Sequence, residues 1–305
     1  MTKYPQSPGA CVAKMAHYMR TETTLSPRSI QFYSETAHAV IEILNRIKAE
    51  SLPYKITEKD IRLLLDEMED MGLARNTQKG YIAALRRITE FYDNNAIKRM
   101  NLRWPADSRP NADWLTLDQA KRLLALKKTP LQELGVHLEL CLGLRRIEIL
   151  RMKTEDIHDS YITVRGKGQM GGKLRNVPYH RDTINVLTAF NRYRQDLIEA
   201  ARSRRPASTA VPEEYVIRLE GSVLRTYDPD GWGWDKTVIV PMREALGFQF
   251  SNHTLRRTFG RIMYRASVPV ATIAQIYGHE STDVTLRYIG VDLDDMSAAM
   301  GLCPI

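Results

Sequence analysis

Helical periodicity, interrupted once by a basic segment that contains prolines, is the feature that most constrains how this chain folds. Apolar residues between Ser26 and Asn95 recur at the spacing that places one stripe of a helix against a core. Residues 98–112 contain two prolines and several basic side chains but few apolar ones, which is typical of a linker. Helical periodicity then resumes. The pattern predicts domains at residues 1–97 and 113–305, joined by a linker at residues 98–112.

Residues that cap helices mark the expected helix ends in the first domain. Pro27 suits a first helical turn, and Thr57 followed by Asp60 resembles a capping box. Another helix is expected from about Asn76 to Tyr92. Its outward side chains include Lys79, Arg86 and Arg87. The first domain is therefore predicted to be compact and helical, with a basic face.

The charge balance favours a polyanion as a partner without requiring one. The formal net charge is +8 and the sequence pI is about 9.3. No apolar run approaches the roughly 18 residues that span a bilayer, and residues 1–16 lack the features of a signal peptide. The three cysteines are far apart and show no metal-ligand spacing. We expect an intracellular protein with no membrane partner, no metal site and no cofactor.

The second domain is expected to contain a small β-hairpin among its helices. Residues 161–165 and 174–178 are β-compatible and flank a glycine-rich stretch, which predicts a hairpin with a long tip. The tip contains Lys167, and Lys173 follows six residues later. Further helices are expected at residues 131–152 and 181–201, whereas residues 202–235 give no clear pattern. The predicted fold class is mainly α with a small antiparallel sheet.

Three short segments of this domain could carry chemistry. His253 and Arg256 are three residues apart, which puts both on one face of a helix. Arg145 and Arg146 stand beside an apolar helix, so one of them must turn inward or pair with a carboxylate such as Glu148 or Asp156. Tyr288 lies on a short final helix that Thr282 can cap. Each segment alone is better explained by ordinary surface or core residues.

Taken in order, these segments resemble the tyrosine recombinase family, also called phage integrases. The pattern comprises a GLRxxE segment, a hairpin lysine, HxLR, a Gly-His pair and a tyrosine nine residues after that histidine. Here it is met by Gly143-Leu144-Arg145 with Glu148, Lys167, His253-Thr254-Leu255-Arg256, Gly278-His279 and Tyr288. Residues 26–95 are similar to the family's SAM-like core-binding domain, and residues 288–296 look like archaeal integrases in particular. Leu142 and Tyr277 depart from the residues that are commoner in the family.

The resemblance implies phosphoryl transfer between DNA strands. Tyr288 would attack a backbone phosphodiester and leave a 3′-phosphotyrosine and a free 5′-hydroxyl. Arg145 and Arg256 would stabilise the charge on the non-bridging oxygens. Lys167 would protonate the leaving oxygen, and His253 would be the base for the tyrosine. In addition, His279 would hydrogen-bond the phosphate and Glu148 would orient its neighbours.

The resemblance also implies partners and alternatives. Double-stranded DNA with paired recombination sites would be bound by Lys79, Arg86, Arg87, Arg103 and Arg257. The protein would form a homotetramer on DNA and a monomer when no DNA is bound. It would act in the cytoplasm, at the nucleoid, and its gene would belong to a virus or plasmid. The alternatives are a type IB topoisomerase, an Xer-type chromosome dimer resolvase and a non-catalytic DNA-binding regulator. An apolar stripe after Tyr288 would either dock on a neighbouring protomer or cover the chain's own core; it consists of Leu293, Met296 and Met300.

Overall fold

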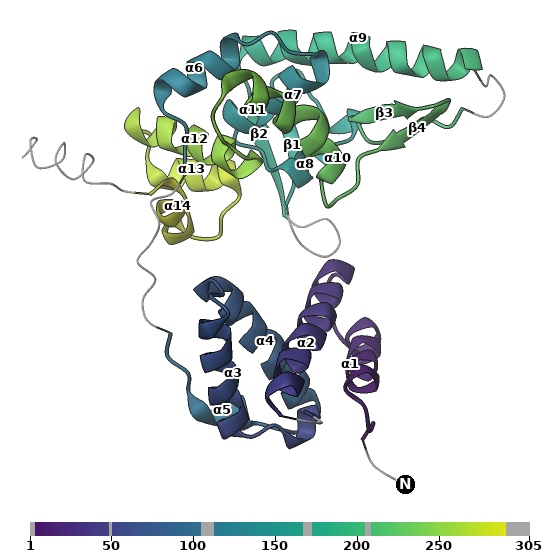
Figure 1. Ribbon diagram of the computed structural model, residues 1–305. Helices are drawn as coiled ribbons and strands as arrows, with labels where there is room; N and C mark the ends of the chain where they lie inside the picture. The colour runs from purple at the N-terminus through teal and green to yellow at the C-terminus, as the bar shows by residue number, and fades with distance from the viewer. Residues whose placement is uncertain (1–3, 49–50, 105–112, 167–172, 205–208, 291–305) are drawn as a thin grey trace, which may run out of the picture. The chain divides into compact units, whose positions relative to one another are not determined.

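The computed structural model describes residues 4–48, 51–104, 113–166, 173–204 and 209–290 (Figure 1). The chain divides into two compact units, residues 1–107 and 108–305, and each unit has its own hydrophobic core. These residues are mainly helical, with two separate two-stranded antiparallel sheets. The predicted fold class is thereby confirmed. None of the helices described is long and apolar enough to cross a membrane.

The described part of the first unit is built from helices. They are α1 (Pro8–Glu22), α2 (Pro27–Ile47), the short η1 (Pro53–Lys55), α3 (Glu58–Asp70), α4 (Arg75–Phe91) and α5 (Ala96–Met100). Ser26 caps α2 with Pro27 in its first turn, and Thr57 and Asp60 form a capping box at α3. Helix α1 was not predicted. Helix α5 extends through Met100, so the first residues of the predicted linker are helical.

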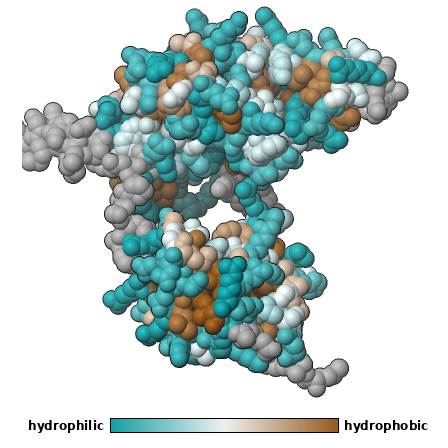
Figure 2. Space-filling view, viewed as in Figure 1, coloured by the Kyte–Doolittle hydropathy of each residue, from teal (hydrophilic) through white to brown (hydrophobic). Residues whose placement is uncertain are grey.

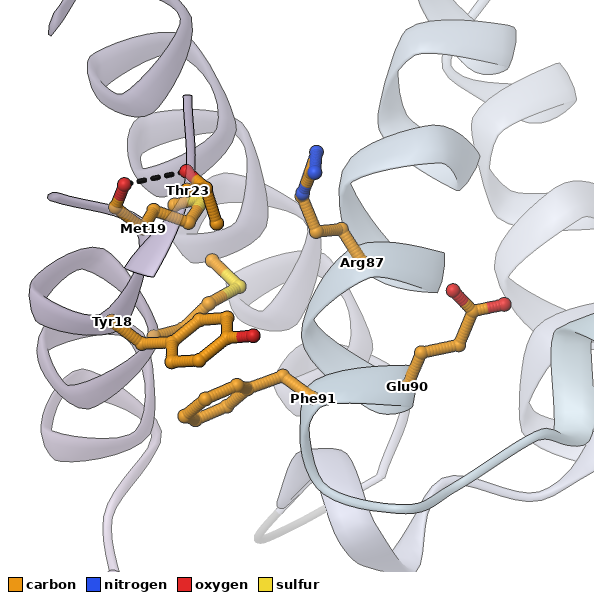
Figure 3. A pocket seen from close by; sticks show the side chains of 7 residues that line it. Tyr18, Met19, Thr23, Arg87, Glu90 and Phe91 are labelled. Atoms are coloured by element: carbon orange, nitrogen blue, oxygen red, sulfur yellow. Dashed lines mark hydrogen bonds between the residues drawn. The ribbon is translucent and has the colours of Figure 1, made fainter. Parts of the chain in front are cut away.

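The core of the first unit is mainly aliphatic, and polar residues cover most of the face seen in Figure 2. Ile41, Leu64 and Leu85 are among the fully buried residues of α2, α3 and α4. Hydrophilic residues cover most of the surface in Figure 2, with hydrophobic residues gathered in smaller patches. A groove of about 410 Å³ opens between α1 and α4 (Figure 3). It is lined by Met15, Tyr18, Met19, Thr23, Arg87, Glu90 and Phe91.

The second unit surrounds its core with helices and two hairpins. Its first half contains α6 (Leu117–Ala125), α7 (Pro130–Leu140), α8 (Arg146–Arg151), η2 (Thr154–Asp156), β1 (Tyr161–Arg165), β2 (Leu174–Pro178) and α9 (Arg181–Arg204). Its second half contains β3 (Ile217–Glu220), β4 (Val223–Thr226), α10 (Trp232–Trp234), η4 (Asp235–Ile239), α11 (Val240–Leu246), α12 (Asn252–Arg265), α13 (Val270–Tyr277) and α14 (Thr282–Ile289). Helix α9 is the longest helix and lies along one edge of the unit (Figure 1).

The first hairpin has the bounds predicted for it. Strands β1 and β2 pair antiparallel, with Val164 opposite Arg175 and Ile162 opposite Val177. Because side chains alternate along a strand, Arg175 and Val177 share one face of the sheet. Val177 is buried on that face, and so is most of the Arg175 side chain. The second hairpin, β3–β4, was not predicted and packs against the C-terminal half of α9.

Three details of the second unit differ from the sequence prediction. The expected helix over residues 131–152 is broken, because Gly143 has a φ of +67° and starts a new segment that leads into α8. Gly143 lies against the rings of Phe259 and Tyr277, which leave no room for a Cβ atom. Ser281, rather than Thr282, caps α14. The apolar spacing of Leu255, Phe259 and Ile262 predicts that all three face the core, but Ile262 is exposed.

Candidate active site

Arg145 is held at the start of α8 by the carboxylate of Glu148, one turn further on. Glu148 Oε2 accepts a hydrogen bond from the Arg145 backbone N–H at 2.8 Å, and Oε1 accepts one from Nη1 at 2.7 Å. The same Nη1 donates to the backbone carbonyl of Tyr277 at 3.1 Å. The Arg145 side chain is 21% exposed. The guanidinium group is therefore oriented on one side while part of it still faces solvent.

Arg256 projects from α12 into the same place and is buried. Its Nη2 donates to the Tyr277 carbonyl at 2.9 Å, and its Nη1 donates to the carbonyl of Gly143. The guanidinium carbon lies 4.1 Å from the centroid of the Tyr277 ring, a cation–π contact. Burial, together with the nearby charge of Arg145, lowers the pKa of Arg256 to about 10. The group therefore still carries its charge at neutral pH.

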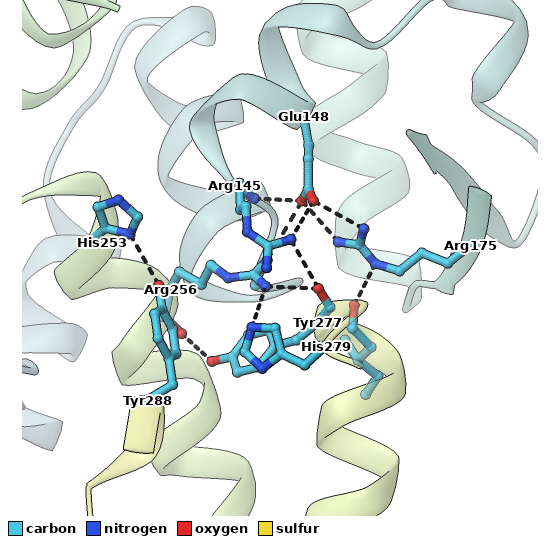
Figure 4. Close-up of polar contacts among 10 residues, drawn as sticks. Arg145, Glu148, Arg175, His253, Arg256, Tyr277, His279 and Tyr288 are labelled. Atoms are coloured by element: carbon cyan, nitrogen blue, oxygen red, sulfur yellow. Dashed lines mark hydrogen bonds and ion pairs between the residues drawn. The ribbon is translucent and has the colours of Figure 1, made fainter. Parts of the chain in front are cut away.

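Glu148 forms ion pairs with three guanidinium groups (Figure 4). Arg145 lies 2.7 Å from it, Arg175 donates to both its oxygens at 3.0 and 2.8 Å, and Arg256 lies 3.6 Å away. Burial acts to raise the pKa of Glu148, but the hydrogen bond from Arg175 and the three positive charges outweigh it and lower the pKa. The cluster therefore holds an ionised carboxylate and an excess of positive charge.

Tyr288, near the end of α14, faces this cluster and is hydrogen-bonded to His253. The distance between His253 Nδ1 and the Tyr288 hydroxyl oxygen is 3.2 Å. The Tyr288 ring lies 5.8 Å from the guanidinium carbon of Arg256 and 5.3 Å from that of Arg257. Burial raises the pKa of Tyr288 in spite of these cations. The phenol is therefore protonated at neutral pH, and it needs a base to become a nucleophile.

His279 follows the C-terminal end of α13 and lies beside Arg256. Its Nε2 is 3.5 Å from Arg256 Nη2, and its Nδ1 is 2.8 Å from the hydroxyl oxygen of Thr285. Because a guanidinium can only donate, Nε2 accepts and the proton of the neutral ring is assigned to Nδ1. Burial, followed by the charges of Arg256 and Arg145, lowers the pKa of His279 to about 4. This imidazole is therefore neutral at pH 7.

Residues 113–294 match the sequence model of the phage integrase family, and this is more than half of the chain. The chain belongs to this family. It is a tyrosine recombinase, an enzyme class that breaks and rejoins DNA strands. Among the curated relatives, "Probable integrase/recombinase YoeC" of Bacillus subtilis (strain 168) is 41% identical over 160 residues, which cover 52% of this chain and 76% of the relative. "Tyrosine recombinase XerC" of Haemophilus influenzae (strain 86-028NP) is 25% identical over 298 residues and covers 92% of both chains.

Solved structures of tyrosine recombinases share the fold. The XerH site-specific recombinase bound to palindromic difH substrate, in a post-cleavage complex, superposes with a TM-score of 0.66 at 17% identity over 95% of this chain and 83% of that one. The Tn1549 transposon integrase in complex with transposon right end DNA gives a TM-score of 0.62 at 16% identity, over 97% and 99% of the two chains. The helical unit and the second unit are both included in these matches.

Six of the residues singled out from the sequence of this recombinase meet in one site: Arg145, Glu148, His253, Arg256, His279 and Tyr288. Lys167 lies outside the described residues. The nearby Lys173, the other lysine that could protonate the leaving oxygen, is 89% exposed and forms an ion pair with Glu280 at 3.5 Å. No group of histidine, cysteine and acidic residues that could hold a metal ion occurs in the parts of the chain that the structure describes.

The residues predicted to bind DNA are divided between the two units. Arg257 packs against the Tyr288 ring in the second unit. In the first unit, Arg86 and Arg103 are exposed, and Lys79 is half-buried. The guanidinium group of Arg87 lies 4.7 Å from the centroid of the Tyr33 ring. All five basic side chains are therefore exposed or half-buried rather than in the core.

The sequence analysis missed two residues of the site, Arg175 and Tyr277. Arg175 shares its strand face with the buried Val177, and a charged residue at a core-facing position was the available signal. Tyr277 was noticed only as a departure from the family pattern. It is fully buried, its carbonyl accepts from both Arg145 and Arg256, and its hydroxyl donates to the carbonyl of Arg256. These contacts join segments that are distant in sequence.

Proposed function

We propose that this recombinase cuts DNA by attack of the Tyr288 phenolic oxygen on a backbone phosphorus. A covalent 3′-phosphotyrosyl bond forms while the bond from phosphorus to the 5′-oxygen breaks, and the reverse attack by a 5′-hydroxyl rejoins a strand. The bond energy is conserved in the covalent intermediate, so rejoining needs no other energy source. The observation that carries the proposal is the 3.2 Å contact between His253 and Tyr288 beside the arginine cluster.

His253 is the proposed base for this attack. The raised pKa of Tyr288 means that its proton must be removed as the bond to phosphorus forms. His253 Nδ1 is within reach of that proton, and an imidazole has an unperturbed pKa of about 6.5, which suits both removal and return of a proton. His253 would return the proton to the tyrosine oxygen when the strand is rejoined.

Arg145 and Arg256 are the proposed ligands of the reacting phosphate. Negative charge on the non-bridging oxygens increases in the transition state, and fixed cations aimed at those oxygens stabilise it. The excess positive charge around Glu148 supports this assignment, because a bound phosphate would supply the missing negative charge. His279 would hydrogen-bond the same phosphate from Nε2: in the DNA complex the ring proton would lie on Nε2, with Nδ1 accepting from the Thr285 hydroxyl. Lys167 is proposed, on the family resemblance alone, to protonate the leaving 5′-oxygen.

The proposed substrate is double-stranded DNA with paired recombination sites, bound by a homotetramer in the cytoplasm. The relatives named as integrases, and the transposon integrase among the similar structures, support integration or excision of a mobile element. An Xer-type role in resolving chromosome dimers is the second candidate. It is favoured by relatives named XerC that cover 92% of the chain.

A covalent adduct on DNA tests the proposal. The protein is incubated with DNA fragments from its own genomic neighbourhood, and adducts are separated on denaturing gels. Tyr288→Phe should bind the same fragments but form no adduct, because the nucleophilic oxygen is absent. Tyr264→Phe, which changes another tyrosine of the second unit, is the matched control and should form the adduct. An adduct that persists in Tyr288→Phe would move the nucleophile elsewhere.

A further inference from the structure

Arg175 joins three elements of the second unit through one side chain. From β2, its Nε donates to the carbonyl of Ile276 in α13 at 2.7 Å, while Nη1 and Nη2 donate to the two oxygens of Glu148 in α8 at 3.0 and 2.8 Å. The side chain is only 11% exposed. Every nitrogen of this guanidinium group therefore donates inside the protein, whereas the Nε of Arg256 has no hydrogen-bond partner among the described residues.

The two hydrogen bonds from Arg175 fix the plane of the Glu148 carboxylate. Its two oxygens also hold Arg145, one through the backbone N–H at 2.8 Å and the other through Nη1 at 2.7 Å. A rotation of the carboxylate about its last bond would break both contacts and release the Arg145 side chain. Two parallel hydrogen bonds from a planar guanidinium oppose that rotation.

We infer that Arg175 is a positioning residue for strand cleavage: it clamps Glu148, and through Glu148 it aims the guanidinium groups of Arg145 and Arg256 at the reacting phosphate. The inference rests on the proposed function, which assigns those two arginines to the phosphate. A lysine would keep the charge, but its single nitrogen cannot hold both carboxylate oxygens and the Ile276 carbonyl in one plane. The geometry, rather than the charge alone, is the contribution of Arg175.

The clamp also anchors the hairpin that carries the proposed acid. In the sequence, Lys167 lies between β1 and β2, and Gly166 donates its N–H to the carbonyl of Lys173 at 3.1 Å where the two strands approach each other. Arg175 follows Lys173 by two residues. Its contacts therefore connect β2 to two helices: α8, which directly follows Arg145, and α13, which His279 follows.

Single-turnover cleavage by the full chain on saturating DNA tests the inference. Arg175→Lys should bind DNA within about twofold of wild type but cleave about 10–100-fold more slowly, the loss expected when reacting groups are slightly misplaced. Arg165→Lys is the matched control, since it makes the same change on the paired strand, where Arg165 binds Asp156 rather than Glu148. It should change neither quantity. Cleavage by Arg175→Lys at the wild-type rate would overturn the inference.

A double-mutant cycle and a titration complete the test. Arg175→Lys added to Glu148→Gln should cost little more than Glu148→Gln alone, because both act through one contact; independent, multiplying losses would overturn the inference. The pKa of His279, measured by NMR without DNA, should rise in Arg175→Gln, and an unchanged value would contradict the assigned cluster. If the wild type forms no adduct, the proposed function fails, and the titration still tests the clamp separately.

Discussion

At the scale of single residues, the site holds more positive than negative charge. Three guanidinium groups surround one carboxylate, and burial, followed by repulsion from Arg145, lowers the pKa of Arg256. Such an arrangement is unfavourable for the free protein but suits a phosphate, which would enter beside Arg145, the partly exposed member. We therefore expect relief of this repulsion to supply part of the substrate's binding energy.

Glu148→Gln should destabilise the second unit by about 3–5 kcal/mol, because it leaves buried guanidinium groups without their carboxylate. Urea denaturation of the full chain measures this free energy of unfolding. Glu155→Gln is the control, since Glu155 is exposed and lies 3.6 Å from Arg165. Its effect should be within about 1 kcal/mol. Equal stability of the two variants would contradict the arrangement around Glu148.

His279 should make the free energy of unfolding decrease as the pH falls. Its pKa falls from 6.5 to about 4 on folding, so the unfolded chain takes up the proton first as the pH falls. The free energy of unfolding should therefore decrease between about pH 6.5 and about pH 5, before most carboxylates titrate. His279→Asn should reduce that decrease when denaturation is measured at both pH values. A decrease of the same size in the variant would show that His279 does not carry the effect.

At the scale of elements, local sequence patterns predicted individual helices and strands. Their breaks and contacts depend on packing between residues that are distant in sequence. The bounds of β1 and β2 were predicted because alternation and turn residues act over a few positions. The break at Gly143 was missed because it depends on the rings of Phe259 and Tyr277, more than a hundred residues away. Arg175 was missed for the same reason, since its partners belong to α8 and α13.

Gly143→Ala tests that break. The substitution places a Cβ against the Phe259 and Tyr277 rings at a φ of +67°, so crowding adds to backbone strain. Together they should cost about 2–4 kcal/mol. Gly247→Ala is the control, because Gly247 has a similar φ of +73° but no atom within 4 Å of an added Cβ. It should cost only about 1–2 kcal/mol from strain. Thermal or urea unfolding compares the two, and equal losses would contradict the packing.

At the scale of the whole molecule, the net charge of +8 makes DNA affinity depend on salt. Each basic side chain that neutralises a phosphate contributes about 0.9 to the slope of log affinity against log salt concentration. Arg86→Ala and Arg103→Ala should therefore each lower the slope by about 1, whereas Arg86→Lys keeps the charge and the slope. Fluorescence anisotropy over a salt series measures it. Slopes that match wild type in both alanine variants would exclude these residues from the interface.

Mass spectrometry of the trapped covalent complex tests the central claim most directly. The wild-type chain is reacted with DNA, the complex is digested with protease and nuclease, and the peptide that carries a 3′-linked nucleotide is sequenced. We predict that the phosphate is attached to the phenolic oxygen of Tyr288, which lies 3.2 Å from His253 Nδ1. Attachment to any other residue would contradict it.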